Sequence, residues 1–255
     1  MRRGNFKVRI LIFAAIAGFA LIRKCSQEEI NPYTGKKQAI SLTPDQEIAI
    51  GLQSAPSMAQ QHGGLHPDTG YQALVDNVGN KLVKNSIAKD TPYKYEFHLL
   101  ADEHTINAFA LPGGQIFITQ ALFSKLKNED QLAGVLGHEI GHVLGKHSNE
   151  RITIANFWKV LAMGSTAIDM GGVAQQFGQG QLLKNGRGDE LESDELGVRF
   201  MINAGYNPEE MIGVMQILKD AAGPNRIPEF QSSHPDPENR IEKIREAIRK
   251  YKNAS

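Results

Sequence analysis

Two histidines four residues apart could bind a metal ion, and the glutamate between them could transfer a proton. His138, Glu139 and His142 lie in the segment Gly-His-Glu-Ile-Gly-His. On an α-helix, residues four apart project from one face. Neutral imidazoles are typical zinc ligands, and a catalytic zinc ion keeps one position for water, whose proton a glutamate can accept. The spacing therefore predicts part of the zinc site of a metallopeptidase.

The residues around this motif predict the helix that it requires. Asn128 suits the N-cap position, and two acidic residues follow it. Apolar residues recur at helical spacing, namely Leu132, Val135, Leu136, Ile140, Val143 and Leu144. Gly141 and Gly145 each lower helix propensity by about 1 kcal/mol relative to alanine, which close packing against a neighbouring element would explain. We expect a buried amphipathic helix.

A third zinc ligand does not follow directly after the second histidine. One extension of the motif places glycine three and histidine six residues further on, but Ser148 stands at the histidine position. That class of site is excluded. His147 would point about 140° away from His142 on a helix, and we expect it to be solvated near the helix end.

An acidic segment further along the chain offers a carboxylate ligand instead. Glu190 and Asp194 are four residues apart, so a helix would place both on one face. Glu190 could then bind zinc while Asp194 accepts the second ring N–H of a zinc-bound histidine. A solvated acidic helix face is the commoner origin of such a cluster, so the residues alone leave both interpretations open.

Taken together, these motifs resemble the gluzincin-type zinc metallopeptidase family that contains HtpX, BepA and LoiP, and the CAAX prenyl endopeptidases. Residues 107–116 and 233–241 also resemble segments of that family. The four ordered motifs cover roughly residues 101–241, and Ser193 stands where alanine is usual. The resemblance implies a zincin-like fold and peptidase activity.

The resemblance also implies a role for each motif residue. His138, His142 and Glu190 would bind one zinc ion per chain. Glu139 would be the general base and later the proton donor. Asp194 would lie behind the ligands and accept a hydrogen bond from one of them.

Three further residues, in the segments 107–116 and 233–241, gain roles in the same way. Asn107 would lie beside the substrate. His234 would stabilise the tetrahedral oxyanion or occupy the open zinc position in a latent state, although a simple turn histidine is the alternative. Arg240 would anchor this loop or pair with a carboxylate rather than touch the substrate.

Residues 107–119 predict two short strands joined through Pro112, Gly113 and Gly114. An exposed edge there could bind an extended peptide through its main chain. Gly113 and Gly114 are therefore candidate substrate-binding residues. An ordinary buried hairpin predicts the same sequence.

Composition favours metal-activated water over other chemistry. The chain has 28 Lys plus Arg against 28 Asp plus Glu, which argues against a nucleic-acid partner. Its single cysteine, Cys25, lies far from the metal motif, so neither an internal disulfide nor a cysteine nucleophile is expected. No serine nucleophile motif with a matching triad is present.

The N-terminus resembles a secretory signal or a short membrane anchor. Residues 1–9 are basic, and residues 10–22 form an uninterrupted apolar run. The run is shorter than the roughly twenty residues of a full span, but the flanking arginines could snorkel and lengthen it. We favour a retained anchor over residues 1–24, with the catalytic domain extracytoplasmic, for example periplasmic. Basic residues directly before Cys25 argue against a lipoprotein signal.

The rest of the chain is expected to form an α+β, mainly helical domain. Its small mixed or antiparallel sheet would lie with one edge beside the zinc-binding helix. The predicted segments are an extended juxtamembrane segment at 25–42, a metallopeptidase domain at 43–255, helices at 69–88, 151–163, 208–221 and 237–251, a strand at 93–100, and a lid or long loop at 164–188.

The function expected from these features is a membrane-associated zinc endopeptidase of the cell envelope. By resemblance its substrates would be unfolded or damaged proteins, with envelope assembly machinery as a possible partner and no nucleic acid. The alternative is a zinc-bearing chaperone or assembly factor with a closed site. A structural zinc domain would instead have four filled protein positions and a dispensable Glu139.

Overall fold

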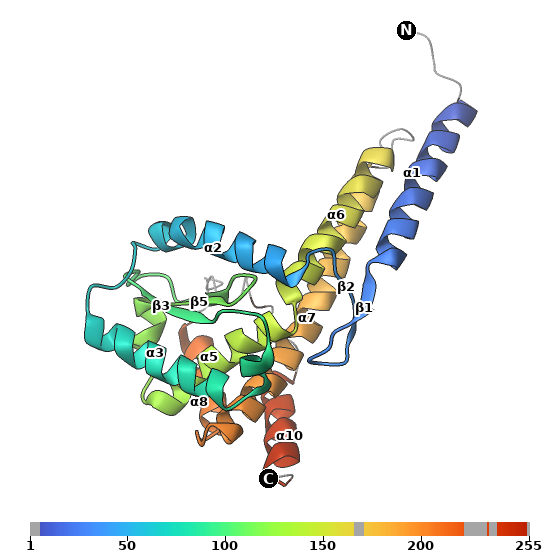
Figure 1. The fold of residues 1–255 in the computed structure, drawn as a ribbon. Coiled ribbons are helices and arrows are strands. Elements are labelled where there is room, and N and C mark those ends of the chain that lie inside the picture. The colour runs from blue at the N-terminus through green and yellow to red at the C-terminus, as the bar shows by residue number, and fades with distance from the viewer. Residues whose placement is uncertain (1–5, 166–170, 222–233, 235–238, 254–255) are drawn as a thin grey trace. The chain divides into compact units, whose positions relative to one another are not determined.

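The computed structural model divides the chain into two compact units, each with its own packing (Figure 1). The residues that it describes are 6–165, 171–221, 234 and 239–253. Unit 1 consists of residues 1–42 and 146–186, and unit 2 of residues 43–145 and 187–255.

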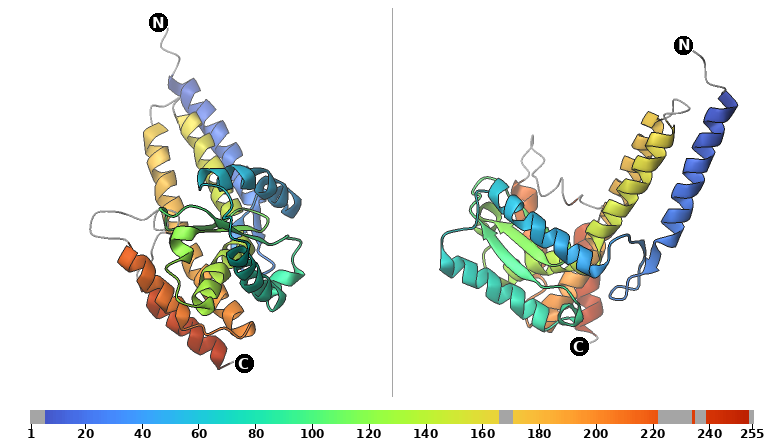
Figure 2. Two further views of the ribbon diagram at one scale, coloured as in Figure 1. Left: turned by 90° about the vertical axis from the view of Figure 1, so that its left-hand side faces the viewer. Right: turned by 45° about the horizontal axis from the view of Figure 1, so that its top comes forward.

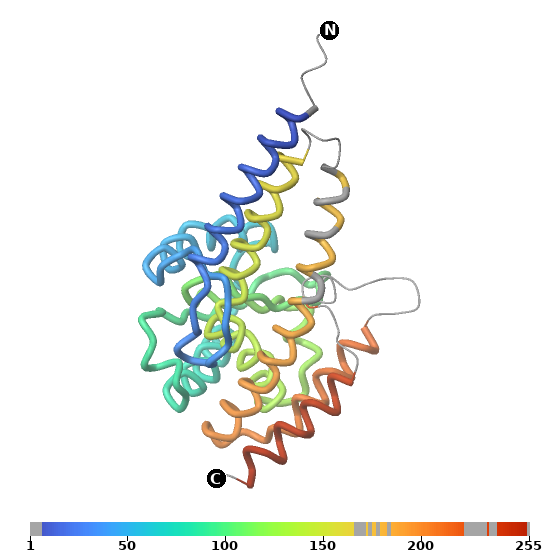
Figure 3. Tube along the Cα trace, turned by 90° about the vertical axis from the view of Figure 1, so that its right-hand side faces the viewer, coloured from blue at the N-terminus to red at the C-terminus, as the bar shows by residue number. Residues whose placement is uncertain are grey.

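In its described part, unit 1 combines helices with a β-hairpin. Its elements are α1 (Phe6–Ser26), β1 (Glu28–Ile30), β2 (Lys37–Ala39), α6 (His147–Ser165) and the first half of α7 (Gly171–Asn203). α1 packs along α6, and in Figure 3 the two run side by side in blue and yellow. None of the helices found within the described residues has the length and apolarity needed to span a membrane.

Residues 164–188 do not form the expected long loop. α6 ends at Ser165, and α7 runs without interruption from Gly171 to Asn203. Residues 166–170 lie outside the described residues. Each glycine in a helix costs only about 1 kcal/mol relative to alanine, so the glycine-rich composition did not prevent a continuous helix.

His147 is a second correction, because it is only 2% exposed rather than solvated. It is the first residue of α6 and not the end of the zinc-motif helix. Lys146, with φ of 53°, adopts the left-handed conformation between the two helices. The chain therefore turns before His147, which the assumption of one continuing helix missed.

Polar side chains fix the β1–β2 hairpin of unit 1. Asn31 is fully buried, and its Oδ1 accepts the N–H groups of Tyr33 and Thr34. Its Nδ2 donates to Gln38 Oε1, and Gln38 Nε2 donates to Glu150 Oε2 on α6. The segment after α1 is thus folded onto the first turn of α6.

Unit 2 contains a mixed three-stranded sheet and most of the helices. Its elements are α2 (Pro44–Gln61), α3 (Thr69–Lys84), the 3-10 helix η1 (Ile87–Asp90), β3 (Glu96–Leu100), β4 (Ala108–Ala110), β5 (Gln115–Thr119), α4 (Gln120–Phe123), α5 (Glu129–Leu144), the second half of α7, α8 (Glu210–Ala221) and α10 (Arg240–Lys252). The strand order is β3-β5-β4, with β3 parallel and β4 antiparallel to β5. The expected mainly helical α+β fold with a small mixed sheet is confirmed, and Figure 2 shows the sheet between helices.

The two edges of this sheet are treated differently. Along β3, the Gln72 side chain donates to the Phe97 carbonyl oxygen at 2.8 Å and accepts the Leu99 N–H at 2.9 Å. Along β4, the bonds of Asn107 and Leu111 point toward β5. By antiparallel alternation, the backbone groups of Ala108 and Ala110 then face outward. β4 therefore presents the edge on which a peptide could pair.

The helix that carries the metal motif begins as expected. Asn128 caps α5 by accepting the N–H of Gln131 at 2.9 Å. Nearly all of its residues from Gln131 onward are buried.

Small residues let α5 and α7 approach closely. A Cβ added to Gly141 would lie 2.9 Å from Ser193 Cα, and one added to Gly137 would lie 3.3 Å from Gly197 Cα. Close packing accounts for Gly141, as expected, and it explains why position 193 holds a small side chain. This contact brings the Glu190 turn beside the two histidines.

Candidate metal centre

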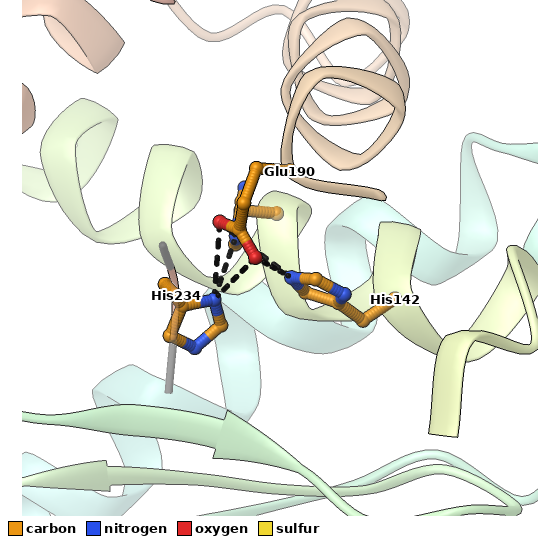
Figure 4. Close-up of side chains that lie close together, drawn as sticks. His142, Glu190 and His234 are labelled. Carbon is orange, nitrogen blue, oxygen red and sulfur yellow. Dashed lines mark hydrogen bonds and ion pairs between the residues drawn. The ribbon is translucent and has the colours of Figure 1, made fainter. Parts of the chain in front are cut away.

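α5 and α7 together bring the predicted ligands into one buried cluster. Glu190 is fully buried and Asp194 is 1% exposed, so the alternative of a solvated acidic face is wrong. His138 Nε2 lies 3.0 Å from His142 Nε2 and 3.2 Å from Glu190 Oε2. His142 Nε2 lies 3.4 Å from Glu190 Oε1 (Figure 4).

These separations fit a tetrahedral zinc site. Bonds of about 2.0–2.1 Å to a central ion place tetrahedral donor atoms about 3.3–3.4 Å apart. The observed 3.0–3.4 Å between the donor atoms of His138, His142 and Glu190 match that edge length. Two imidazoles and one carboxylate also form a donor set suited to zinc.

His234 joins the cluster from a segment near the C-terminus. Its Nδ1 lies 3.1 Å and 3.2 Å from the two Glu190 oxygens and 3.3 Å from His138 Nε2. The ligand atoms of all four residues lie within 4.8 Å of one another. Four protein donors therefore meet where a catalytic zinc site keeps one position for water.

The second ring nitrogen of His234 contacts the β4 edge. Nε2 lies 3.3 Å from the carbonyl oxygen of Ala108, which can only accept a hydrogen bond. Nδ1 faces the Glu190 oxygens, which also only accept. If a metal ion took the Nδ1 lone pair, Nε2 would keep the proton and donate it to the Ala108 carbonyl. No sequence pattern predicts the Ala108 contact, because the group involved is a backbone carbonyl.

Glu139 is buried beside this cluster without a satisfied carboxylate. It is 1% exposed, and neither oxygen has a hydrogen-bond partner among the described residues. His234 approaches it from the neighbouring segment, with Nε2 3.6 Å from Oε1. Burial raises the pKa of Glu139 above its usual range. A carboxylate left unsatisfied in this place suits the transient acceptance of a proton.

Asp194 contacts the Nδ1 side of the His138 ring, and Arg240 contacts Asp194. Asp194 Oδ1 lies 2.8 Å from His138 Nδ1, and Arg240 donates to both Asp194 oxygens, at 2.6 Å and 2.9 Å. Burial by itself raises the pKa of Asp194, but Arg240 and His138 together outweigh burial, and the net pKa is lowered. An ionised Asp194 accepts the Nδ1 proton, so His138 Nε2 is left free to bind a metal.

The charges of the cluster also determine the state of the metal-free histidine. Burial lowers the pKa of His138, yet hydrogen bonds to Asp194 and Glu190 more than compensate and raise the pKa to about 10. Burial raises the pKa of Glu190, but His234, His142 and His138 together outweigh burial and keep the pKa well below its usual range.

The remaining predicted residues lie along β4 and its turn. Asn107 is 3% exposed, and its backbone carbonyl accepts the N–H of Thr119 at 3.0 Å. Gly113 and Gly114 have φ of 83° and 109°, values that favour glycine. A Cβ on Gly113 would overlap the α2 backbone at Ile48. The turn thus accounts for both glycines, and their contact with a substrate stays a prediction.

Comparisons with known proteins give a family match and several similar proteins. The family model described as Peptidase family M48 matches residues 71–248. A beta-barrel assembly-enhancing protease from Yersinia pestis is 29% identical over 239 residues, covering 88% of this chain and 48% of that protein. The corresponding Escherichia coli protease is 31% identical over 254 residues, covering 92% and 50%.

A mitochondrial relative is similar over a comparable length. The metalloendopeptidase OMA1 of Schizosaccharomyces pombe is 28% identical over 244 residues, covering 92% of this chain and 71% of OMA1. The chain spans about half the length of the two bacterial proteases that it matches.

Proposed function

Because the chain belongs to peptidase family M48, we propose that unit 2 is a zinc endopeptidase that hydrolyses bonds within polypeptide chains. The observation that carries this proposal is the buried Glu139 carboxylate, which has no hydrogen-bond partner among the described residues and lies beside the converging donors. A structural metal site has no use for such a costly group. A zinc ion held by His138, His142 and Glu190 would lower the pKa of water and polarise the scissile carbonyl.

Each residue around the donors then has a distinct role. Glu139 accepts the proton of the attacking water and returns it to the leaving amine. Asp194 holds the tautomer of His138, and Arg240 keeps Asp194 ionised. The peptide main chain pairs with the outer edge of β4, beside Asn107 and the 113–114 turn.

We assign two positions to His234. In the described position its Nδ1 completes the donor set, while its Nε2–H occupies the Ala108 carbonyl on the β4 edge. A substrate requires both places, so this position is latent. After displacement by a substrate, His234 would be near enough to stabilise the developing oxyanion.

The proposed substrates are unfolded or damaged envelope proteins. Support comes from the relatives whose names refer to β-barrel assembly, although they extend beyond the matched part. Recognition through a strand edge also suits unfolded chains, because main-chain pairing needs little side-chain specificity. Anchoring through residues 1–24, an extracytoplasmic domain and contact with assembly machinery belong to the same proposal.

A second candidate function follows from the four filled donor positions. If His234 stays in place, the protein would bind polypeptides as a chaperone or assembly factor without hydrolysis. The described position of His234 favours this alternative, because four protein donors then meet at the site. Displacement of His234 by a substrate would remove that support. The two candidate functions therefore predict different results when the His234 side chain is removed: a latent peptidase would hydrolyse polypeptides, and a binding factor would not.

One experiment separates these possibilities. We would measure hydrolysis of unfolded casein by the wild type, Glu139→Gln and His234→Ala proteins while quantifying bound zinc in each. The proposal expects zinc in all three and cleavage by the wild type or by His234→Ala, but not by Glu139→Gln. Zinc without cleavage in wild type and His234→Ala would support the binding factor, and cleavage by Glu139→Gln would reject the base.

A further inference from the structure

The surface of α1 in unit 1 is unusually apolar for an exposed helix. Large apolar side chains between 44% and 72% exposed occur at Val8, Ile10, Leu11, Ile12, Phe19, Leu21 and Ile22. Single exposed apolar residues are ordinary, but contiguous ones mark an interaction surface. These residues form two groups on the same helix, at 8–12 and 19–22, and such repeated exposure indicates a partner.

The apolar surface continues from α1 onto the end of α6. The helices run antiparallel, since Gly164 contacts Ile16 while Phe157 lies under the Lys24 ammonium, 5.1 Å from it. Between them, α1 and the C-terminal half of α6 form an open apolar groove. It is lined by Ala15, Ile16, Phe19, Val160, Met163 and Gly164. Met163 is 68% exposed at its rim. Both helices therefore contribute to one apolar surface.

The charges around this surface identify the partner. α1 has basic residues before and after its apolar run, at Lys7, Arg9, Arg23 and Lys24, and residues 1–27 contain no acidic residue. Between Arg151 and the end of α6, only Lys159 is charged. Basic flanks match phosphate headgroups, and the apolar middle matches acyl chains. A second copy of the same surface would bring like charges together.

We propose that α1 and the C-terminal part of α6, residues 157–165, form one lipid-binding surface and that both helices enter an anionic bilayer together. Residues 10–22 of α1 extend about 20 Å as a helix, against a hydrocarbon thickness of about 30 Å, so the pair enters the bilayer without crossing it. The inference rests on the proposed membrane association and adds α6 to it. Peptidase activity is not required for it.

The chain carries its own probe, because Trp158 on α6 is the single tryptophan of the sequence. The full-length protein would be mixed with phosphatidylcholine vesicles, with or without phosphatidylglycerol, whose acyl chains are brominated. We expect flotation with the anionic vesicles and quenching of Trp158. Flotation without quenching would show that α1 inserts alone and overturn the inference. Absence of flotation would overturn both it and the proposed membrane association, and self-association without flotation would indicate a second copy as partner.

Two matched variants test the surface itself. Met163→Glu places a charge at the distal end of α6 and should weaken vesicle binding about tenfold or more. Ile152→Glu changes another exposed apolar residue, 37% exposed, near the opposite end of the helix, and should leave binding unchanged. Equal weakening of vesicle binding by the two variants would contradict a lipid-binding surface at the C-terminal end of α6. Casein hydrolysis in the absence of vesicles should not change in either variant, so failure of the lipid surface is distinguishable from failure of the peptidase assignment.

Discussion

At the scale of single residues, Asp194 links the proposed zinc ligands to the rest of the protein. It accepts from His138 on one side and from Arg240 on the other. We predict that Asp194→Asn weakens zinc affinity by about 10- to 100-fold, because the uncharged amide no longer holds the ligand tautomer. Competition against a chromophoric zinc chelator measures the change.

Glu195→Gln is the matched control for that prediction. It removes the adjacent carboxylate on α7, which pairs with Lys250 and Tyr251 instead of the cluster. Zinc affinity should stay within about twofold of the wild type. Equal weakening by both variants would mean that Asp194 acts through the stability of α7, not through His138.

Asp102 supports a prediction about pH away from the metal centre. Its carboxylate accepts the N–H groups of His104 and Thr105 and lies 2.9 Å from His62 Nδ1. Burial raises the pKa of Asp102, but these hydrogen bonds outweigh burial and lower it well below 3.8. A carboxyl group whose pKa is lower in the folded than in the unfolded protein stabilises the fold at pH values above its unfolded-state pKa. This stabilisation is lost as the pH falls toward the folded-state pKa.

Asp102→Asn should therefore destabilise unit 2 by about 1–3 kcal/mol at pH 7. The difference from the wild type should shrink progressively below about pH 5. Urea unfolding at neutral and acidic pH measures it, with exposed Glu103→Gln as the control. A difference independent of pH would show that the charge of Asp102 is unimportant.

Spacing alone identified some of these residues and not others. His138, Glu139 and His142 lie within one helical turn, so their placement follows from local geometry. Glu190 lies far along the chain, and only a resemblance separated it from a solvated acidic face. The contact between His234 and the Ala108 carbonyl could not be predicted, because any residue type supplies the same backbone carbonyl to a strand edge.

At the scale of elements, the α5–α7 contact sets the distance between the ligands. Gly141→Ala would place a Cβ 2.9 Å from Ser193 Cα and 3.0 Å from its carbonyl oxygen. Because backbone atoms cannot yield cheaply, we predict a destabilisation of about 1–3 kcal/mol together with weaker zinc binding. Urea unfolding and chelator competition measure the two effects.

Gly134→Ala provides the comparison on the same helix. Its added Cβ would make ordinary contacts, the nearest at 3.5 Å. Alanine raises helix propensity by up to about 1 kcal/mol, so this variant should be neutral or more stable. If both variants destabilise alike, helix packing at Gly141 is not the cause.

Local signals predicted the elements that begin with a cap and missed those that depend on distant packing. Asn128 starts α5, and its cap forms as expected. α7 was missed at residues 171–188, where the glycine-rich composition indicated a loop. The role of Gln72 in closing the β3 edge depends on the packing of α3 beside the sheet, which no local pattern specifies.

At the scale of the whole molecule, unit 2 has two separate sources of stability. One is a core of aliphatic side chains that are 0% exposed, including Val75, Leu82, Leu99, Ile116 and Leu136. Each buried side chain of this kind contributes about 1.5–3 kcal/mol. The other is the donor cluster, whose ligands come from α5, α7 and residue 234. The core does not depend on metal, so the fold should outlast metal removal.

Chelation of zinc is therefore expected to lower the melting temperature without unfolding the protein at 25 °C. Loss of a ligand present at a hundred times its Kd costs about 2.7 kcal/mol, which corresponds to roughly 5–10 °C for a domain of this size. Without metal, the raised pKa of His138, about 10, keeps it protonated at neutral pH. Its positive charge then offsets the buried carboxylates of Glu190 and Asp194. Far-UV circular dichroism before and after chelation, and after zinc is restored, tests this. Collapse of the helical signal on chelation would instead identify zinc as a structural ion, and the buried carboxylate of Glu139 would then need another explanation.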